Sequence, residues 1–112
     1  MPHVTTEQDS TRYRVVWNNT VLAESDKTII VHEGSLPPRR YFPPEDVQME
    51  LFARASNTAR CPWKGEWSHL NMTVGRQTVP NTAWTYFKTI EDGPQIKDYV
   101  AFYENKVEVI AV

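Results

Sequence analysis

The sequence predicts a mainly β domain with one short α-helix near residues 44–55. Three observations lead to this class. Short segments with apolar residues at alternate positions recur along the chain, Asn, Gly and Pro separate them, and Trp, Tyr and Phe make up 12% of the 112 residues. Alternation is the period of a half-buried strand, and aromatic side chains suit a pleated surface.

The N-terminal part predicts a loose segment followed by strands. Residues 1–11 are polar and unpatterned, so we expect a flexible terminus there and one β-rich domain over 12–112. Residues 12–17 read RYRVVW, and alternation places Tyr13, Val15 and Trp17 on one face of a strand.

The next segments complete a predicted three-stranded antiparallel meander. Asn18 and Asn19 suit a tight hairpin turn because Asn tolerates positive φ angles. Strands are expected over 20–25 and 28–33, with Ile29 and Val31 sharing a face.

A proline-rich loop interrupts the strands and leads into the expected helix. Pro37-Pro38 and Pro43-Pro44 cannot donate ladder hydrogen bonds. Pro44 suits the first position of a helix, and the acidic residues that follow it complement the positive end of the helix dipole.

The C-terminal half returns to strand patterns. Strands are predicted over 66–74 and 82–87, and a hairpin is predicted from 99–103 and 107–112. Alternation puts Trp67 and His69 on one side of the first of these strands. It likewise puts Trp84 and Tyr86 on one face of the second.

Composition excludes several classes of protein. The formal net charge is −2, with 12 Lys and Arg scattered among 14 Asp and Glu, so the basic face typical of a nucleic-acid-binding protein is not expected. The single cysteine cannot form an intrachain disulfide. No segment reaches the roughly 18 apolar residues of a membrane span, and the first residues lack a secretory apolar region. We therefore expect a cytoplasmic protein with no membrane partner.

Several short motifs, taken in order, carry a family resemblance over residues from about 15 to 112. They are LAES at 22–25, a strand ending in Glu33, YFPPEDV at 41–47, Thr58 followed by CPWKG at 61–65, AWTY at 83–86 and YVAFY at 99–103. In their order and spacing they resemble the domain of unknown function 427 family, which also carries a nucleotidyltransferase-like label.

The resemblance implies a small, strongly bent fold of two antiparallel sheets that meet like the sides of a tent, with a pocket between them. Relatives of that architecture often hold zinc between pairs of Cys-x-x-Cys, whereas this chain has only Cys61. Nucleotidyl transfer would need paired carboxylates for two metal ions after a Gly-Ser helix start, a pattern absent from the sequence. Phe87 and Lys88 follow AWTY where the family commonly has prolines.

The CPWKG segment is the most unusual stretch. A nearby cation lowers the pKa of a thiol, so Lys64 could make Cys61 a nucleophile. The chain offers no second cysteine, and no histidine lies close in sequence to act as its base. One alternative is that Cys61 is a buried, inert core residue. Another is that Pro62 and Gly65 hold Lys64 in a fixed direction as an anion-binding group.

The sequence predicts a ligand-binding pocket if distant loops meet in the bend. Arg40 and Lys64 would attract a carboxylate or phosphate, and Trp84 or Tyr86 would stack on a flat ring. The full predicted ligand-binding set is Glu33, Arg40, Tyr41, Lys64, Trp84 and Tyr86.

Three functional hypotheses remain open from the sequence. The first is a module that binds a small anionic or aromatic molecule or a peptide, with no cofactor. The second is an enzyme that uses Cys61 and Lys64 covalently, or His69 as an acid/base near Glu33. The third is a protein-interaction domain that uses exposed aromatic residues. No metal site is expected, because His3, His32, His69 and Cys61 have no paired ligand spacing.

Overall fold

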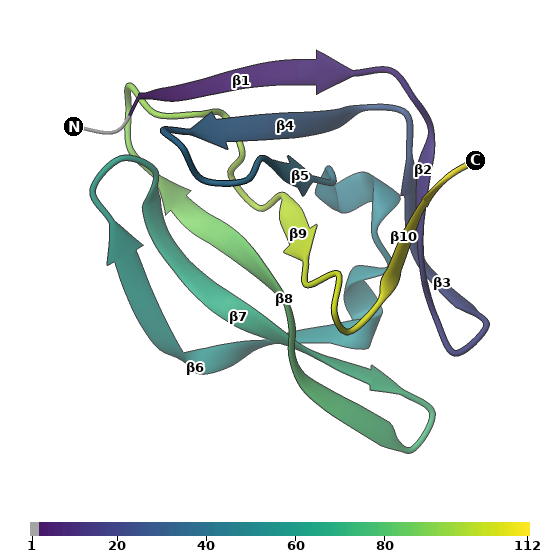
Figure 1. The fold of residues 1–112 in the computed structure, drawn as a ribbon. Helices are drawn as coiled ribbons and strands as arrows, with labels where there is room; N and C mark the ends of the chain where they lie inside the picture. The colour runs from purple at the N-terminus through teal and green to yellow at the C-terminus, as the bar shows by residue number, and fades with distance from the viewer. Residues whose placement is uncertain (1–2) are drawn as a thin grey trace.

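A computed structural model describes residues 3–112 and has ten strands and two short 3-10 helices (Figure 1). The predicted mainly β class is confirmed. The strands are β1 (Val4–Asp9), β2 (Tyr13–Trp17), β3 (Thr20–Ser25), β4 (Thr28–Glu33), β5 (Arg39–Tyr41), β6 (Phe52–Cys61), β7 (Gly65–Val74), β8 (Gln77–Thr89), β9 (Val100–Phe102) and β10 (Glu108–Ala111).

The strands form three antiparallel sheets, with the orders β1-β4-β5, β10-β2-β3 and β6-β7-β8-β9. The resemblance implied two bent sheets; here the strands of the N-terminal part are divided between two of the three. The edge strands β5 and β9 belong to different sheets and meet at one isolated bridge between Phe42 and Val100. The first and third sheets are therefore joined at this point.

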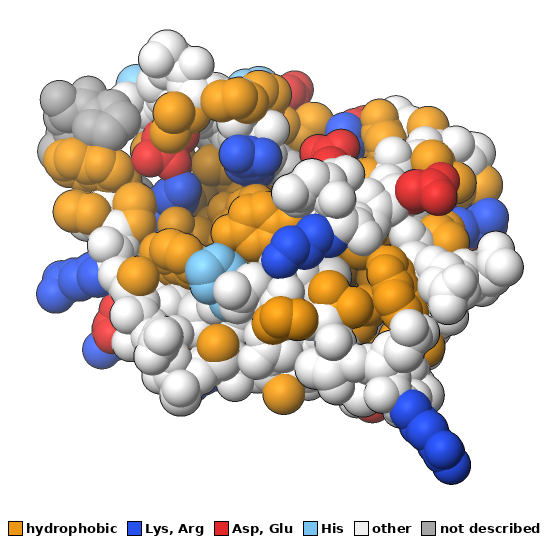
Figure 2. Space-filling model, turned by 60° about the horizontal axis from the view of Figure 1, so that its bottom comes forward, with side chains coloured by type: hydrophobic (Ala, Val, Ile, Leu, Met, Phe, Trp, Pro, Cys, Tyr) orange, Lys and Arg blue, Asp and Glu red, His pale blue; other side chains and the backbone are white. Residues whose placement is uncertain are grey.

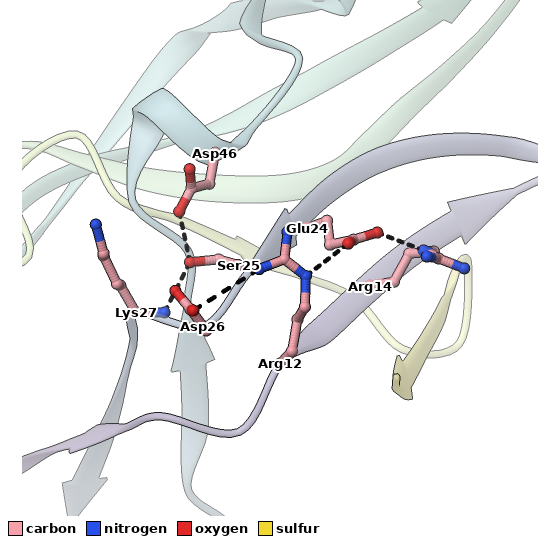
Figure 3. Close-up of polar contacts among 7 residues, drawn as sticks. All are labelled: Arg12, Arg14, Glu24, Ser25, Asp26, Lys27 and Asp46. Atoms are coloured by element: carbon pink, nitrogen blue, oxygen red, sulfur yellow. Dashed lines mark hydrogen bonds and ion pairs between the residues drawn. The ribbon is translucent and has the colours of Figure 1, made fainter.

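The β2–β3 hairpin follows the prediction at its turn. Asn18 and Asn19 have φ angles of 47° and 61°, which is the left-handed conformation that a two-residue hairpin requires. At the other end of the hairpin, Glu24 accepts hydrogen bonds from the Nε atoms of Arg12 and Arg14 (Figure 3).

The predicted meander is wrong at its third strand. β4 pairs with β1 and β5 rather than with β3. The chain leaves β3 at Ser25 and enters another sheet, and the Ser25 hydroxyl donates a 2.6 Å hydrogen bond to Asp46 (Figure 3). Ser25 therefore ties this corner to the segment that follows the proline-rich loop.

The N-terminal segment is a strand where the sequence indicated a flexible terminus over 1–11. β1 pairs along its whole length with β4, from Val4 opposite Glu33 to Asp9 opposite Thr28. The strand is polar because it is an edge strand whose four central residues are exposed. Backbone pairing orders this segment although its side chains show no apolar alternation. Residues 1 and 2 lie outside the described part of the chain.

The expected α-helix near 44–55 is replaced by two 3-10 helices, η1 (Pro44–Asp46) and η2 (Met49–Leu51), followed by β6. The first of these ends at Asp46, and the next residue, Val47, is extended and forms a bridge with Ala23. Gln48 then donates its backbone N–H to the carbonyl of Leu22. Pairing with β3 thus interrupts the helical start that Pro44 provides.

The two C-terminal strands do not form the predicted hairpin. β9 pairs with β8, whereas β10 crosses to the second sheet and pairs with β2, with Val109 opposite Val15. The turn between them is stabilised by a backbone hydrogen bond from Val107 to Tyr103. The end of the chain therefore connects two sheets.

Two hydrophobic cores lie on the two faces of the β7–β8 ribbon. The first contains the buried residues Val15, Leu22, Ala23, Phe42, Val47, Leu70, Met72, Ala83, Val100, Phe102 and Val107. The second contains Ile29, Val31, Tyr41, Trp84, Tyr86, Ile96 and Ala101. Since side chains alternate along a strand, Ala83 contributes to the first core and Trp84 to the second.

Candidate functional site

The candidate site begins with four ring side chains on one face of β7 and β8. Trp67 pairs with Tyr86 across the strands, and His69 pairs with Trp84. The rings of Trp67 and His69 are 5.0 Å apart and nearly perpendicular, a favourable edge-to-face arrangement. The face that alternation predicted is therefore present as an aromatic surface.

Two tyrosines from outside β7 and β8 extend this surface and fix its geometry. Trp84 Nε1 donates a 3.0 Å hydrogen bond to the hydroxyl of Tyr41 on β5. Tyr103 follows β9, and its ring centroid is 4.6 Å from that of Trp84. Its hydroxyl also lies 2.9 Å from Nε2 of His69. These contacts hold Trp84 in one orientation between the sheets.

Burial raises the pKa values of the tyrosine hydroxyls in this surface. It raises the pKa of Tyr41 to about 12, against a partly opposing effect of the hydrogen bond from Trp84. Burial also raises the pKa of Tyr86 far above its usual range, and that of Tyr103 above the ordinary value. At neutral pH all three side chains are uncharged.

Lys64 reaches the aromatic surface from the turn between β6 and β7. Its backbone N–H bonds to the Cys61 carbonyl, and Gly65 after it has a φ of 135°. The ammonium group forms a 2.5 Å ion pair with Glu33 and lies 5.2 Å from the ring centre of Tyr86. The Lys64 side chain is only 13% exposed and that of Glu33 17%, so the two charges compensate one another in a mostly buried position.

Arg39, which the sequence did not single out, is the second cation of the site. It lies on β5 two residues before Tyr41, so both side chains project to the same face. Its guanidinium carbon is 5.8 Å from the centre of the Trp84 ring. Among residues 3–112 it forms no ion pair, and it is exposed.

Arg40, the predicted anion-binding arginine, lies on the other face of β5. Its Nη1 atom is 2.8 Å from Asp9 and 2.7 Å from the Thr28 hydroxyl. Its guanidinium also stacks 3.7 Å from the ring centre of Tyr13. We expected Arg40 to lie with Lys64 in the ligand-binding site. Arg39 lies there instead, because adjacent residues of a strand project to opposite faces and Arg39 is the one that faces Trp84.

A cavity of about 140 Å³ lies beside Trp84, between Arg39 and Lys64. Its lining residues are Val31, Glu33, Leu36, Pro37, Arg39, Tyr41, Lys64 and Trp84. Of the predicted set, Glu33, Tyr41, Lys64 and Trp84 line this cavity, whereas Tyr86 lies against Lys64 without lining it. In the view of Figure 2, hydrophobic side chains gather in a hollow that basic and acidic side chains border.

The predicted catalytic candidates have other contacts. Cys61 is half-buried beside the second core, while the nearby ammonium of Lys64 is paired with Glu33. His69 contacts Tyr103 and Trp67, and Glu33 faces Lys64 rather than His69. Catalysis by these residues stays a sequence prediction.

In the described range, no three His, Cys, Asp or Glu side chains gather in a manner that could hold a metal ion. The same part of the chain contains no helix with the length and apolar character needed to cross a membrane.

The fold and the site define a small, mainly β domain with an aromatic hollow between two of its sheets. The chain matches the family model described as "Domain of unknown function (DUF427)" over residues 5–112, and it belongs to this family. A search of curated proteins found no match.

Proposed function

We propose that this protein binds a small molecule or peptide group that combines one flat ring with one negative charge. The ring would enter the cavity beside Trp84 and Tyr41, and the anionic group would pair with Arg39. The observation that carries the proposal is the position of Arg39, an exposed cation over Trp84 at a cavity where the other cation is already neutralised.

The size of the cavity favours a single ring. Its volume is about 140 Å³, close to the roughly 150 Å³ of an engineered apolar cavity that binds benzene. A ligand with fused rings would extend beyond it.

The charge of the site favours a monoanion. Glu33 compensates Lys64 within 2.5 Å, so these two groups together contribute no net charge. Arg39 adds one uncompensated positive charge, and a planar guanidinium suits a carboxylate because it can donate two parallel hydrogen bonds.

The test compares ring compounds that differ only in charge. Phenylacetate, benzyl alcohol and benzylamine are titrated against the protein while the indole N–H resonance of Trp84 is followed by NMR. Phenylacetate should bind most tightly and should weaken at high salt, because an exposed arginine pair is screened by ions. Stronger binding of benzylamine would contradict the proposal.

Arg39→Gln should weaken phenylacetate binding by roughly fivefold, the size expected for a partly exposed charge pair. Arg54→Gln is the matched control, since Arg54 also lies over an aromatic ring, that of Phe87, but does not line the cavity beside Trp84. Equal losses in both variants would show that Arg39 has no special role. Binding that leaves the Trp84 resonance unmoved would place the ligand elsewhere.

A further inference from the structure

A second cavity lies directly beside the candidate site. Its volume is about 220 Å³, and it shares Arg39 and Trp84 with the smaller cavity. Its buried lining residues are Phe42, Trp84, Ala101 and Phe102, and its exposed ones are Pro38, Arg39 and Glu104. The two cavities are therefore neighbours with Arg39 and Trp84 between them, and together they are called the recess.

This second cavity lies where β5 and β9 separate. The backbone N–H of Phe42 bonds to the Val100 carbonyl at 2.8 Å, and the N–H of Val100 bonds back to Phe42 at 2.9 Å. Beyond this bridge the described strands β5 and β9 form no further pair. The next positions that would pair are Arg40 and Phe102, and both line the cavity.

Strand geometry directs the backbone groups of these two residues into the recess. Along a strand the N–H and C=O groups of every second residue point to the same side. Phe42 and Val100 point toward each other because they are hydrogen-bonded. Arg40 and Phe102, two residues further along their strands, point the same way, into the space between β5 and β9. Among residues 3–112 no strand pairs with Arg40 or Phe102 on this side, so two open strand edges face one another across an apolar floor.

The charges around the recess favour one orientation of a bound chain. Arg40 also lines the larger cavity but is paired with Asp9, so the carboxylate of Glu104, unpaired among the described residues, disfavours an anion there. Arg39 lies at the junction, and in the smaller cavity Glu33 is compensated by Lys64. A negatively charged chain end is therefore favoured at Arg39, with the rest of the chain leading away through the larger cavity.

We propose that the recess binds the C-terminal end of an extended peptide. The last side chain, an aromatic ring, occupies the smaller cavity, and the terminal carboxylate pairs with Arg39. The peptide unit on the N-terminal side of the penultimate residue lies between Arg40 and Phe102 and bonds to their backbone groups. This inference rests on the proposed function, since it assigns the ring and the anion to the same residues.

A peptide fits these features because its backbone supplies donors and acceptors at the spacing of a strand. Addition of a strand to a free sheet edge gains affinity from main-chain hydrogen bonds, while pockets for side chains supply specificity. The recess offers the free edges of β5 and β9 together with one ring-sized pocket.

The first experiment compares N-acetylphenylalanine with acetyl-glycyl-alanyl-phenylalanine, both with a free carboxylate. Ring and charge are the same, so the two compounds differ in their backbone groups and in the single methyl group of alanine. The tripeptide should bind roughly tenfold more tightly, as two net backbone hydrogen bonds would give. Methylation of the amide nitrogen of its alanine should remove most of that gain, and amidation of its C-terminus should weaken binding at Arg39.

The second experiment follows amide hydrogen exchange of the whole protein. Without peptide, the amides of Arg40 and Phe102 should exchange faster than those of Tyr41 and Ala101, which face paired strands. The tripeptide should slow exchange at Arg40 and Phe102, and N-acetylphenylalanine should not. Tyr41 and Ala101 serve as internal controls.

The outcomes separate the two proposals. If N-acetylphenylalanine and the tripeptide bind equally well and exchange at Arg40 and Phe102 is unchanged, the peptide inference is overturned while the ring-and-anion site stands. If neither compound binds, both proposals fail. Tighter tripeptide binding with protection at both amides supports both.

Discussion

Gly65 is the residue on which the position of Lys64 most directly depends. Its φ of 135° lies in a region that side chains rarely adopt, and a Cβ atom there would be 2.0 Å from the carbonyl oxygen of Lys88. The backbone of β8 lies too close for any other residue. The CPWKG turn can thus present Lys64 to Glu33 only while position 65 has no side chain.

Gly65→Ala should destabilise the protein by more than about 3 kcal/mol, because backbone overlap is added to the conformational strain. Urea denaturation at neutral pH would measure this loss. Gly75→Ala is the matched control, since Gly75 also has a positive φ but has no atom within 4 Å of an added Cβ. Its expected cost is about 1–2 kcal/mol, the strain of the left-handed conformation alone. Equal costs at both positions would mean that the contact with Lys88 is easily relaxed.

The ring residues of the site could be predicted individually, whereas its arginine could not. Trp67, His69, Trp84 and Tyr86 share a face because each pair is two residues apart in an uninterrupted strand. Arg39 and Arg40 lie on a strand of only three residues after a proline-rich loop. A shift of one residue there exchanges the two faces, and no local pattern in the sequence indicated which arginine faces Trp84.

At the scale of whole elements, β1 is held to its sheet by polar contacts. Its side chains bury little apolar surface, and Asp9 at its end forms an ion pair with Arg40 on β5, beyond the intervening β4. The backbone N–H of Thr11 bonds to the same carboxylate. Sequence patterns missed β1 and β6 because both edge strands are largely polar, and hydrophobic alternation detects only strands with a buried face.

Asp9→Asn should destabilise the protein at neutral pH and have little effect in acid. The hydrogen bond from the Thr11 backbone, and then the one from Arg40, lower the pKa of Asp9 below its ordinary value of 3.8. A lowered pKa in the folded state gives stability that is complete above pH 3.8 and is lost as the pH falls through the folded value. Urea denaturation across this range would reveal the difference.

Asp92→Asn serves as the control for this substitution, since Asp92 is exposed in a loop and forms no ion pair with the described residues. Its midpoint should follow that of the unmodified protein at every pH. An Asp9→Asn variant with the same midpoints as the unmodified protein would show that Asp9 does not anchor β1.

For the molecule as a whole, the site depends on how three sheets meet. The β7–β8 ribbon contributes one face to each core, so the aromatic surface is supported from behind by the first core. The bridge between Phe42 and Val100 closes one end of the recess. The mainly β class could be predicted from alternation, but the crossings at Ser25 and after Tyr103 could not. Those crossings are decided by long-range pairing of β4 with β1 and of β10 with β2.

Closure of the first sheet over the aromatic surface makes the whole molecule sensitive to alkaline pH. Burial raises the pKa of Tyr41 to about 12 and that of Tyr86 further still, from an ordinary value of 10.0. A raised pKa in the folded state gives stability that is complete below pH 10 and declines as the pH rises toward and beyond 12.

Tyr86→Phe should therefore flatten the decline in unfolding free energy above pH 10, whereas Tyr99→Phe, outside the buried pair, should leave its slope unchanged. Denaturant titrations followed by tryptophan fluorescence, with phenolate absorbance recorded in parallel, would measure both. If Tyr86 ionises near pH 10 while the protein stays folded, its ring is open to water, and the two sheets do not close over the site as described.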